Sequence, residues 1–234
     1  MKSITKIIAA LAAVLLLYGL VTVGVNAIFN RTAWLYREYS DKLDIERFSG
    51  ISAEDATRVL SRMMYYSIGR ADDLDITIEE DGVEVSFFNE SELSHMRDVR
   101  RLAKTILWTG GISLIISIGV VCALLMLKKH DALRTFSKAY LIALCVAAVI
   151  IIALAVWVAV DFDGFWVTFH IVFLDLESST FDPATSRMIR ICPAELFADF
   201  TGRLGGYVAA LTGAVGIACA LHLHLIKKQN RLRK

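Results

Sequence analysis

Four apolar stretches without any charged residue constrain this chain more than any other feature of its sequence. They comprise residues 7–28, 105–127, 139–160 and 204–226, and each contains 22 or 23 residues. An α-helix needs roughly 20 apolar residues to cross the hydrocarbon core of a bilayer. Both prolines of the chain lie outside these stretches, which is typical of uninterrupted helices. The sequence therefore predicts four transmembrane helices.

The overall composition agrees with a membrane protein. Hydrophobic residues make up 56% of the chain, compared with about 45–50% in an average soluble domain. Because this apolar excess is concentrated in the four charge-free stretches, it excludes a cytosolic enzyme, a disordered chain and a secreted disulfide scaffold. Lys2 and Lys6 precede the first stretch, and residues 25–27 loosely resemble a signal-peptidase site. The apolar core of a signal peptide has only about 7–15 residues, so we expect this stretch to be retained as a helix.

The distribution of Lys and Arg predicts the orientation in the membrane. Residues 1–6, 128–138 and 227–234 hold 11 Lys and Arg among 25 residues. Residues 29–104 and 161–203 hold 14 among 119. Because cytoplasmic segments carry the excess of positive charge, we expect a multi-pass cell-membrane protein with both termini in the cytoplasm. The two longer segments are then exoplasmic.

The first exoplasmic segment, residues 29–104, is expected to form a small α+β cap. Ser52 is a typical helix N-cap and Gly69 a typical helix stop. Alternating apolar residues on both sides of Asp81-Gly82 predict a β-hairpin. Asn89 followed by Glu92 predicts a capping box for a helix that continues into the second span.

The second exoplasmic segment, residues 161–203, has a different character. Aromatic residues recur at helical spacing, which predicts an interfacial or partly re-entrant helix. They are Phe162, Phe165, Trp166, Phe169 and Phe173. Asp182-Pro183 is typical of a helix start, and Cys192-Pro193 of a further short turn. The predicted fold class is thus an α-helical integral membrane protein with four transmembrane helices, a small α+β exoplasmic cap and this interfacial loop.

The positions of the four cysteines indicate that they are packing residues and not catalytic ones. Cys122, Cys145 and Cys219 lie within the predicted spans, where a thiol behaves as a small apolar group. Cys192 lies outside them, so no disulfide is expected within the exoplasmic parts of one chain. A nucleophilic role for Cys192 stays an alternative that lacks an obvious partner.

Two histidines near the outer membrane boundary are the best candidates for chemistry. His95 and His170 come from different exoplasmic segments, and Asp98 follows His95 by one helical turn. Histidine suits proton transfer near neutral pH, and Asp98 is placed either to orient His95 or to bind Arg101. A metal site is less favoured, because no third firm ligand is visible. His130, His222 and His224 are expected to lie at the membrane interface.

The sequence around both histidines resembles the lipoprotein intramolecular transacylase (Lit) family. Residues 94–100 (SHMRDVR) resemble the motif at the start of that family's second span. Residues 161–173 (DFDGFWVTFHIVF) resemble its second signature, followed by residues 181–183 (FDP) and 193–197 (PAELF). The order of spans and segments also agrees over nearly the whole chain. Residues 177–179 and Ser186 differ from the family pattern.

The resemblance implies an acyl transfer within one lipid-modified protein. Such enzymes move the sn-2 acyl chain of a diacylglyceryl-cysteine lipoprotein onto the α-amino group of the same cysteine, giving a lyso-form lipoprotein. The implied partners are diacylated bacterial lipoproteins and membrane lipids, without a cofactor, a metal or nucleic acid, and the enzyme is expected to act as a monomer. The substrate supplies the nucleophile, which agrees with the absence of a familiar hydrolase motif.

On this resemblance His95 and His170 are expected to act as base or acid and as oxyanion partner, in an order left open, with Asp98 orienting His95. The expected substrate-binding residues are Arg97, Arg100, Arg101, Phe165, Trp166, Phe169 and Phe173. Simple interfacial anchoring is an equally good explanation for the aromatic residues. A noncatalytic scaffold or sensor is the main alternative function. A metal-dependent hydrolase follows, and a transporter is disfavoured because the spans lack charged residues.

Overall fold

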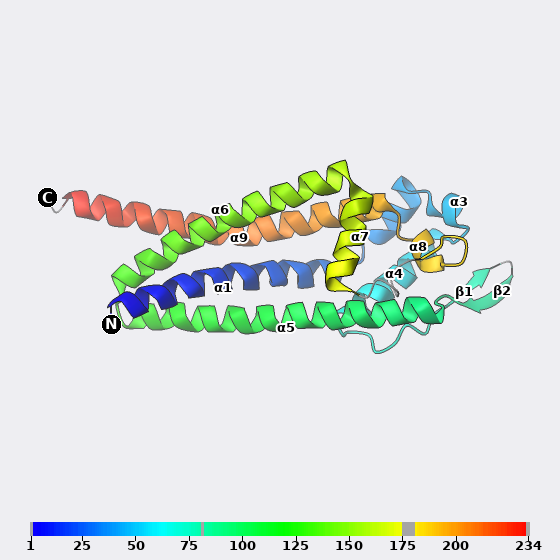
Figure 1. Cartoon of the computed structure of the whole chain (residues 1–234), viewed down its shortest axis with the longest axis horizontal. Helices are drawn as coiled ribbons and strands as arrows, with labels where there is room; N and C mark the ends of the chain where they lie inside the picture. Colours follow the sequence, from blue (N-terminus) through cyan, green and yellow to red (C-terminus); the bar gives the residue numbers. More distant parts are fainter. Residues whose placement is uncertain (1, 81, 175–180, 233–234) are drawn as a thin grey trace. The chain divides into compact units, whose positions relative to one another are not determined.

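The computed structural model describes residues 2–80, 82–174 and 181–232 (Figure 1). Four helices are long and apolar enough to cross a membrane. They are α1 (Lys2–Phe29), α5 (Glu90–Met126), α6 (His130–Val160) and α9 (Ala194–Leu232). The other elements are α2 (Leu35–Arg37), the π-helical η1 (Glu38–Lys42), α3 (Ile45–Ser49), α4 (Ala53–Ser67), β1 (Thr77–Glu80), β2 (Val83–Ser86), α7 (Phe162–Phe173) and α8 (Arg187–Arg190). The predicted fold class, a helical membrane protein with four long apolar helices and a small hairpin, is confirmed.

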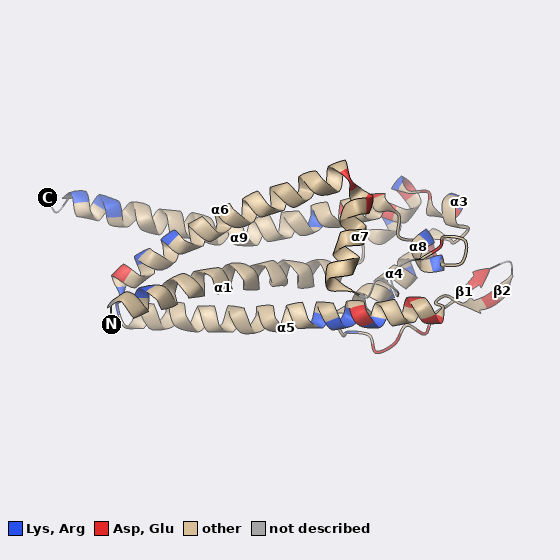
Figure 2. Ribbon diagram, in the orientation of Figure 1, with Lys and Arg blue, Asp and Glu red and all other residues tan. Residues whose placement is uncertain are grey.

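The chain divides into two compact units. The membrane unit contains Met1–Val25, Leu107–Phe162 and Gly206–Lys234. The cap unit contains Asn26–Ile106 and Asp163–Gly205. Charged residues are sparse along the central parts of the four long helices (Figure 2). Each unit has its own cluster of buried apolar side chains.

The helices of the membrane unit approach one another through small and hydroxyl-bearing residues. A Cβ atom added to Gly110 of α5 would overlap the side chain of Thr22 on α1. The Ser117 hydroxyl donates a hydrogen bond to the Ala12 carbonyl over 2.7 Å, which also joins α5 to α1. The Tyr140 hydroxyl donates to the Thr212 carbonyl over 2.9 Å and joins α6 to α9. Close approach and interhelical hydrogen bonds supply the specificity that apolar surface alone does not provide in lipid.

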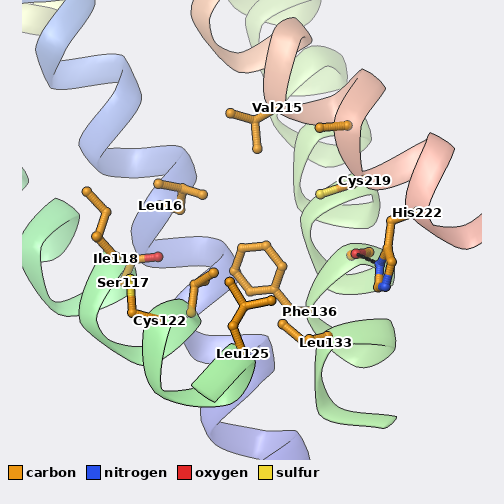
Figure 3. A pocket seen from close by; sticks show the side chains of 13 residues that line it. Leu16, Ser117, Ile118, Cys122, Leu125, Leu133, Phe136, Val215, Cys219 and His222 are labelled. Carbon is orange, nitrogen blue, oxygen red and sulfur yellow. Dashed lines mark hydrogen bonds between the residues drawn. The ribbon is translucent and has the colours of Figure 1, made fainter. Parts of the chain in front are cut away.

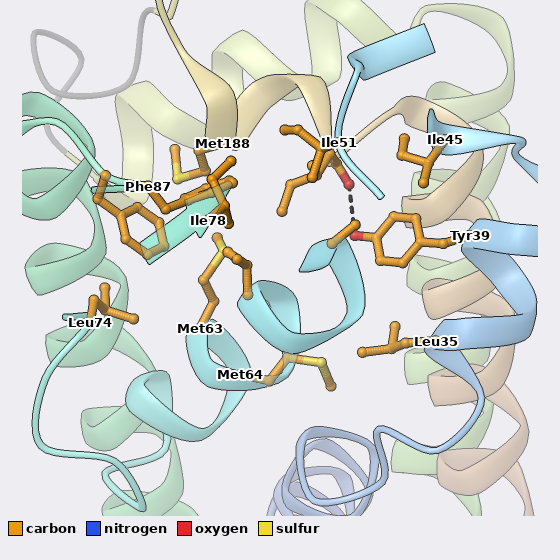
Figure 4. Close-up of a cluster of buried hydrophobic side chains, with 14 of the residues drawn as sticks. Leu35, Tyr39, Ile45, Ile51, Met63, Met64, Leu74, Ile78, Phe87 and Met188 are labelled. Carbon is orange, nitrogen blue, oxygen red and sulfur yellow. Dashed lines mark hydrogen bonds between the residues drawn. The ribbon is translucent and has the colours of Figure 1, made fainter. Parts of the chain in front are cut away.

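The cap unit is organised around α4. Ser52 caps this helix by accepting a hydrogen bond from the Asp55 backbone N–H, and Gly69 follows it with a φ of +81°. Both features agree with the helix predicted from the sequence. Apolar residues from separate segments pack against α4 (Figure 4). Tyr39, which is fully buried, donates a hydrogen bond from its hydroxyl to the Ile191 carbonyl over 2.7 Å.

The predicted hairpin forms at the edge of this core. Strands β1 and β2 are antiparallel, with Thr77 opposite Ser86. Gly82 has a φ of +79°, which a tight turn requires, while Asp81 lies outside the described residues. Glu80 pairs with Arg187 and Arg190, which ties the hairpin to α8. The Arg187 side chain, hydrogen bonded to Glu80, holds the pKa of that carboxyl below its usual range.

Two local predictions for residues 181–193 are wrong. Asp182 does not cap a helix: its carboxylate accepts from the Ala184 N–H and its carbonyl from the Thr185 and Ser186 N–H groups, which closes a turn. The short helix α8 begins later and is capped by Ser186. Pro193 does not start a short turn either, because it leads directly into the long helix α9.

Candidate active site

His95 is positioned by the first turn of α5. The Asn89 N–H donates to Glu92 Oε2 over 2.8 Å, and the Glu92 N–H donates to Asn89 Oδ1 over 2.9 Å. This reciprocal pair is the capping box that the sequence predicted. His95 follows Glu92 by about one turn and lies on the buried side of the helix, with 8% of its surface exposed.

Glu92 has a second role that the sequence did not reveal. Its side chain is fully buried, and Oε1 accepts hydrogen bonds from the Ser186 hydroxyl (2.5 Å) and the Met188 N–H (2.9 Å). One carboxylate thus caps α5 and also fixes the start of α8. A buried carboxylate is stable only when its oxygens are hydrogen bonded. Glu92 therefore fixes the segment just before α8 next to the first turns of α5.

His170 has a defined tautomer. It lies on α7 with 4% of its surface exposed, and its Nδ1 is 2.7 Å from the Trp166 carbonyl oxygen. A carbonyl can only accept a hydrogen bond, so Nδ1 carries the proton. In the neutral ring the lone pair is then on Nε2. His170 is consequently prepared to accept a proton at Nε2.

The two histidines predicted to form a pair lie together within the cap unit. Their ring centroids are 5.7 Å apart, with an interplanar angle of 24°. The Phe181 ring meets His95 edge-on at 5.3 Å. The Trp166 ring lies 4.5 Å from His170. Two imidazoles from distant parts of the sequence therefore share one aromatic environment.

This environment keeps His95 neutral. The pKa of His95 is lowered from its ordinary 6.5 to about 4, mainly by burial and also by His170, while the nearby Asp98 charge acts in the opposite direction. Nδ1 of His95 is buried, and no described residue provides it with a hydrogen-bond partner. A neutral imidazole has one N–H to donate and one lone pair. His95 can therefore contribute a hydrogen bond to a bound molecule without changing its own charge.

The polar residues predicted around His95 occupy different positions. The Asp98 carboxylate lies 3.0 Å from Arg101, so its effect on His95 is Coulombic and not a direct hydrogen bond. Arg97 pairs with Glu90 at 3.3 Å. Arg100 donates to the Ala71 carbonyl over 2.9 Å and to the Asp72 carbonyl over 3.3 Å, and its guanidinium lies 4.3 Å from the ring centroid of Tyr66. Arg100 thereby fixes the loop after α4, whereas Arg97 and Arg101 lie nearer the surface.

The predicted aromatic residues divide into two groups. Trp166 and Phe169 contact His170, and Trp166 also packs against Phe197 of α9 at 4.7 Å. Phe165 stacks on Phe169 at 6.3 Å. Phe173 also contacts Phe169, at 5.1 Å, but is 56% exposed. Trp166 and Phe169 therefore pack directly against His170, whereas Phe165 and Phe173 contact Phe169 and lie farther from the histidine.

Cys192 does not have the properties of a nucleophile. Burial, reinforced by the Glu92 charge, raises the pKa of its thiol to about 12, so the reactive thiolate is suppressed. Among the described residues, no group of three His, Cys, Asp or Glu side chains converges as a metal site. Residues 177–179, where the sequence differs from the family pattern, lie outside the described residues.

Comparison with known proteins relates this arrangement to one family. The sequence model of the family "Lipoprotein intramolecular transacylase Lit" matches residues 10–197. An in meso structure of the membrane integral transacylase Lit from Bacillus cereus superposes with a TM-score of 0.71 at 20% identity, covering 99% of this chain and 98% of that chain. A histidine-to-arginine mutant of the same protein gives 0.67 at 19% identity, covering 100% and 95%. A histidine-to-alanine mutant gives 0.67 at 20% identity, covering 99% and 96%. No curated protein sequence matches the chain.

Proposed function

The chain belongs to the lipoprotein intramolecular transacylase family of membrane enzymes, and from this premise we propose that it moves the sn-2 acyl chain of a diacylglyceryl-cysteine lipoprotein to the α-amino group of that cysteine. The product is a lyso-form lipoprotein that is N-acylated and keeps one acyl chain on glycerol. The reaction rearranges atoms within one molecule and consumes no water.

The stacked pair of His95 and His170 is the observation that supports this reaction best. The transfer needs a base for the amine and a hydrogen-bond donor for the tetrahedral intermediate. His170 offers the lone pair of Nε2, because Nδ1–H is held by the Trp166 carbonyl. His95 is the neutral neighbour whose N–H can serve as the donor.

The proposed steps balance as follows. The neutral amine nitrogen attacks the sn-2 ester carbonyl, so a C–N bond forms and the carbonyl oxygen becomes an oxyanion. His170 Nε2 takes the proton that the amine loses, while His95 donates a hydrogen bond to the oxyanion. The C–O bond to glycerol then breaks, and the protonated His170 returns the proton to the glycerol oxygen. The α-amino group of a protein has a pKa of about 8, so a neutral amine is available near neutral pH.

The surrounding residues support this chemistry in two ways. The amine and the ester belong to one molecule, so the enzyme has to align them and does not have to bring two substrates together. Phe165, Trp166 and Phe169 are proposed to line the path of the acyl chain and to exclude water, with Phe173 at its margin. Arg97 and Arg101, which are exposed apart from their ion pairs, are proposed to contact lipid headgroups.

We place this site on the exoplasmic side of the cell membrane, with both termini in the cytoplasm. The support is the excess of Lys and Arg in residues 1–6, 128–138 and 227–234. We also propose that one chain is sufficient for activity, because both histidines come from the same chain.

Mass spectrometry of a lipoprotein N-terminal peptide tests the reaction. A host that makes only diacyl lipoproteins would express the full chain or the double variant His95→Asn/His170→Asn at matched levels. The total mass stays constant, and fragment ions report whether an acyl chain has moved from glycerol to nitrogen. We expect migration with the wild-type chain and none with the double variant. Absence of migration with the folded wild-type chain overturns the proposed reaction, and full migration with the double variant overturns the histidine assignment.

A further inference from the structure

The membrane unit contains an apolar pocket that the proposed reaction does not use. It has a volume of about 430 Å³ and is lined by residues of all four long helices, including Leu16, Cys122, Phe136 and Val215 (Figure 3). This volume is in the range of about 300–1,000 Å³ that is typical of ligand sites. Ile118 and Leu125 line it and are more than half exposed, so the pocket opens onto the outer surface of the helices. In a bilayer that surface faces lipid.

One ionisable group stands out in this lining. The pocket has no Asp, Glu, Lys or Arg in its wall, and the Ser117 hydroxyl is already hydrogen bonded to α1. His222 of α9 faces Ser137 of α6 at 2.8 Å between Nδ1 and the hydroxyl, an interaction drawn in Figure 3. The hydrogen bonds among described residues engage only Nδ1 of this ring. The pocket thus combines a hydrocarbon-like interior with a polar group that can meet a headgroup.

Positive charge lies directly beside this pocket. The Lys128 N–H donates to the carbonyl of Leu125, and Lys129 accepts at its carbonyl from the N–H of Leu133. Leu125 and Leu133 both line the pocket, so the backbone of the two lysines lies one helical turn or less from residues of its wall. Residues 128–138 contain four Lys and Arg and one Asp. None of these four cations is in an ion pair with a described residue, so their charge is available to an external anion.

We propose that this pocket binds one anionic membrane phospholipid, whose acyl chain occupies the apolar interior and whose phosphate lies near Lys128, Lys129 and His222. The apolar wall explains the chain, because an open apolar pocket within a bilayer fills with hydrocarbon and not with water. The unpaired cations explain the headgroup, because basic pockets between transmembrane helices recognise anionic lipid heads. A zwitterionic lipid would fill the pocket but would gain little from the lysines.

Native mass spectrometry of the full-length protein tests this lipid preference. The protein would be released from bilayers of phosphatidylcholine and phosphatidylglycerol mixed in equal amounts, and the retained lipid would be counted. We expect one phosphatidylglycerol to be retained several-fold more often than phosphatidylcholine. Equal retention of both lipids overturns the proposal of an anionic site.

Two variants with matched controls locate the site. Ala218→Phe fills the pocket wall, while Ala220→Phe places the same ring at an exposed position of α9 that does not line the pocket. Retention of phosphatidylglycerol is expected to fall to background only in Ala218→Phe. Lys128→Gln/Lys129→Gln should weaken it at least about five-fold, since each cation near a membrane surface contributes roughly that factor. Arg37→Gln/Arg47→Gln removes the same charge from exposed cap residues and should have no effect.

Photocrosslinking of the lipid to the wild-type chain tests the proposed site without any substitution, so it remains informative if a variant fails to fold. Phosphatidylglycerol with a photoactivatable acyl chain would be crosslinked in the bilayer and the labelled peptides identified. We expect labels near Leu133 and Phe136 of α6 and Val215 of α9 that unlabelled phosphatidylglycerol displaces. Labels spread evenly over the lipid-facing helices would show only the ordinary lipid annulus and would overturn the proposal.

Discussion

Eight arginines of the cap unit lie within 4.0 Å of a carboxylate, whereas the four cations of residues 128–138 in the membrane unit form no ion pair with any described residue. Several of these pairs join separate elements of the cap unit: Arg187 and Arg190 hold the hairpin through Glu80, and Arg203 pairs with Asp199 and lies near Glu38. The cations at the α5–α6 turn have no such internal partner among the described residues, which is why we propose an external anion for them. Ion pairing alone does not decide which charges bind a ligand, so the comparison has to be tested by substitution.

The histidines of the two units differ in the same way. His170 commits one nitrogen to a backbone carbonyl and stacks on a second buried imidazole. His222 bonds to a hydroxyl at the edge of an apolar pocket. The first arrangement fixes the tautomer of His170, whereas the hydrogen bonds among described residues engage only Nδ1 of His222. If this comparison is right, substitutions in the cap unit should change the chemistry or the fold.

The largest effect is expected from His170→Asn, which removes the lone pair at Nε2. General base catalysis contributes about 10²–10⁴-fold, so the rate of acyl migration should fall by at least about 100-fold. His224→Asn, at an exposed position of α9, is the matched control and should convert the lipoprotein normally. The readout is the initial rate of N-acylated lipopeptide formation. A His170→Asn rate within a few-fold of the wild type would remove His170 from the role of base.

Glu92→Ala should have the next largest effect. It leaves the Ser186 hydroxyl and the Met188 and Asn89 N–H groups without their acceptor, at a cost of about 3 kcal/mol in the stability of the cap unit. Glu90→Ala, two residues earlier on the same helix, removes an exposed partner of Arg97 and should cost less than about 1 kcal/mol. Hydrogen exchange of α8 and the start of α5 measures both. Equal protection in the two variants would contradict the role of Glu92 in joining α5 to the start of α8.

Glu92 and Asp182 show which features of the fold could be predicted from the sequence and which could not. The capping box of Asn89 and Glu92, the helix from Ser52 to Gly69 and the four apolar helices depend on neighbouring residues, so local patterns were sufficient. The bond from Glu92 to Ser186 joins residues 94 positions apart, and no local pattern encodes it. Asp182 illustrates the converse error, because an Asp-Pro pair suits a turn as well as a helix start.

The candidate site also contains features that local sequence patterns predict and features that depend on tertiary contacts. His95 and His170 were recognisable as ionisable residues beside the predicted spans, and family motifs surround both. Their stacking, the tautomer of His170 and the burial of Cys192 depend on how α5, α7 and α8 pack. Arg97, Arg100 and Arg101 lie within five residues of sequence, yet among the described contacts only Arg100 binds backbone carbonyls. Residue type therefore selected the candidate residues, and tertiary contacts determine the partners of each one.

The pH dependence of stability is expected to show a smaller effect that belongs to His95. Its folded-state pKa is about 4, below the ordinary value of 6.5, so the unfolded chain binds more protons between these values. Stability should therefore decrease as the pH falls from 6.5 towards 4, by at most about 3 kcal/mol. His95→Asn should flatten the curve in this window. Thermal denaturation in detergent measures the slope, and a His95 imidazole that titrates near 6.5 by NMR would contradict the assigned burial.

The smallest effect on stability is expected from Arg97→Gln, and it tests whether pairing alone fixes the fold. The Arg97–Glu90 pair is exposed on both sides, so its loss should cost less than about 1 kcal/mol. Arg100→Gln, on the same helix, loses two backbone hydrogen bonds and the contact with Tyr66, and should cost about 1–3 kcal/mol. Thermal denaturation compares the stability of the two variants.

If Arg97 contacts lipid headgroups, Arg97→Gln should raise the KM for the lipoprotein while kcat stays unchanged. The reason is that the lost contact binds the ground state and the transition state equally and does not touch the reacting atoms. An unchanged KM would leave Arg97 as a solvated surface residue and restrict headgroup recognition in the cap unit to Arg101.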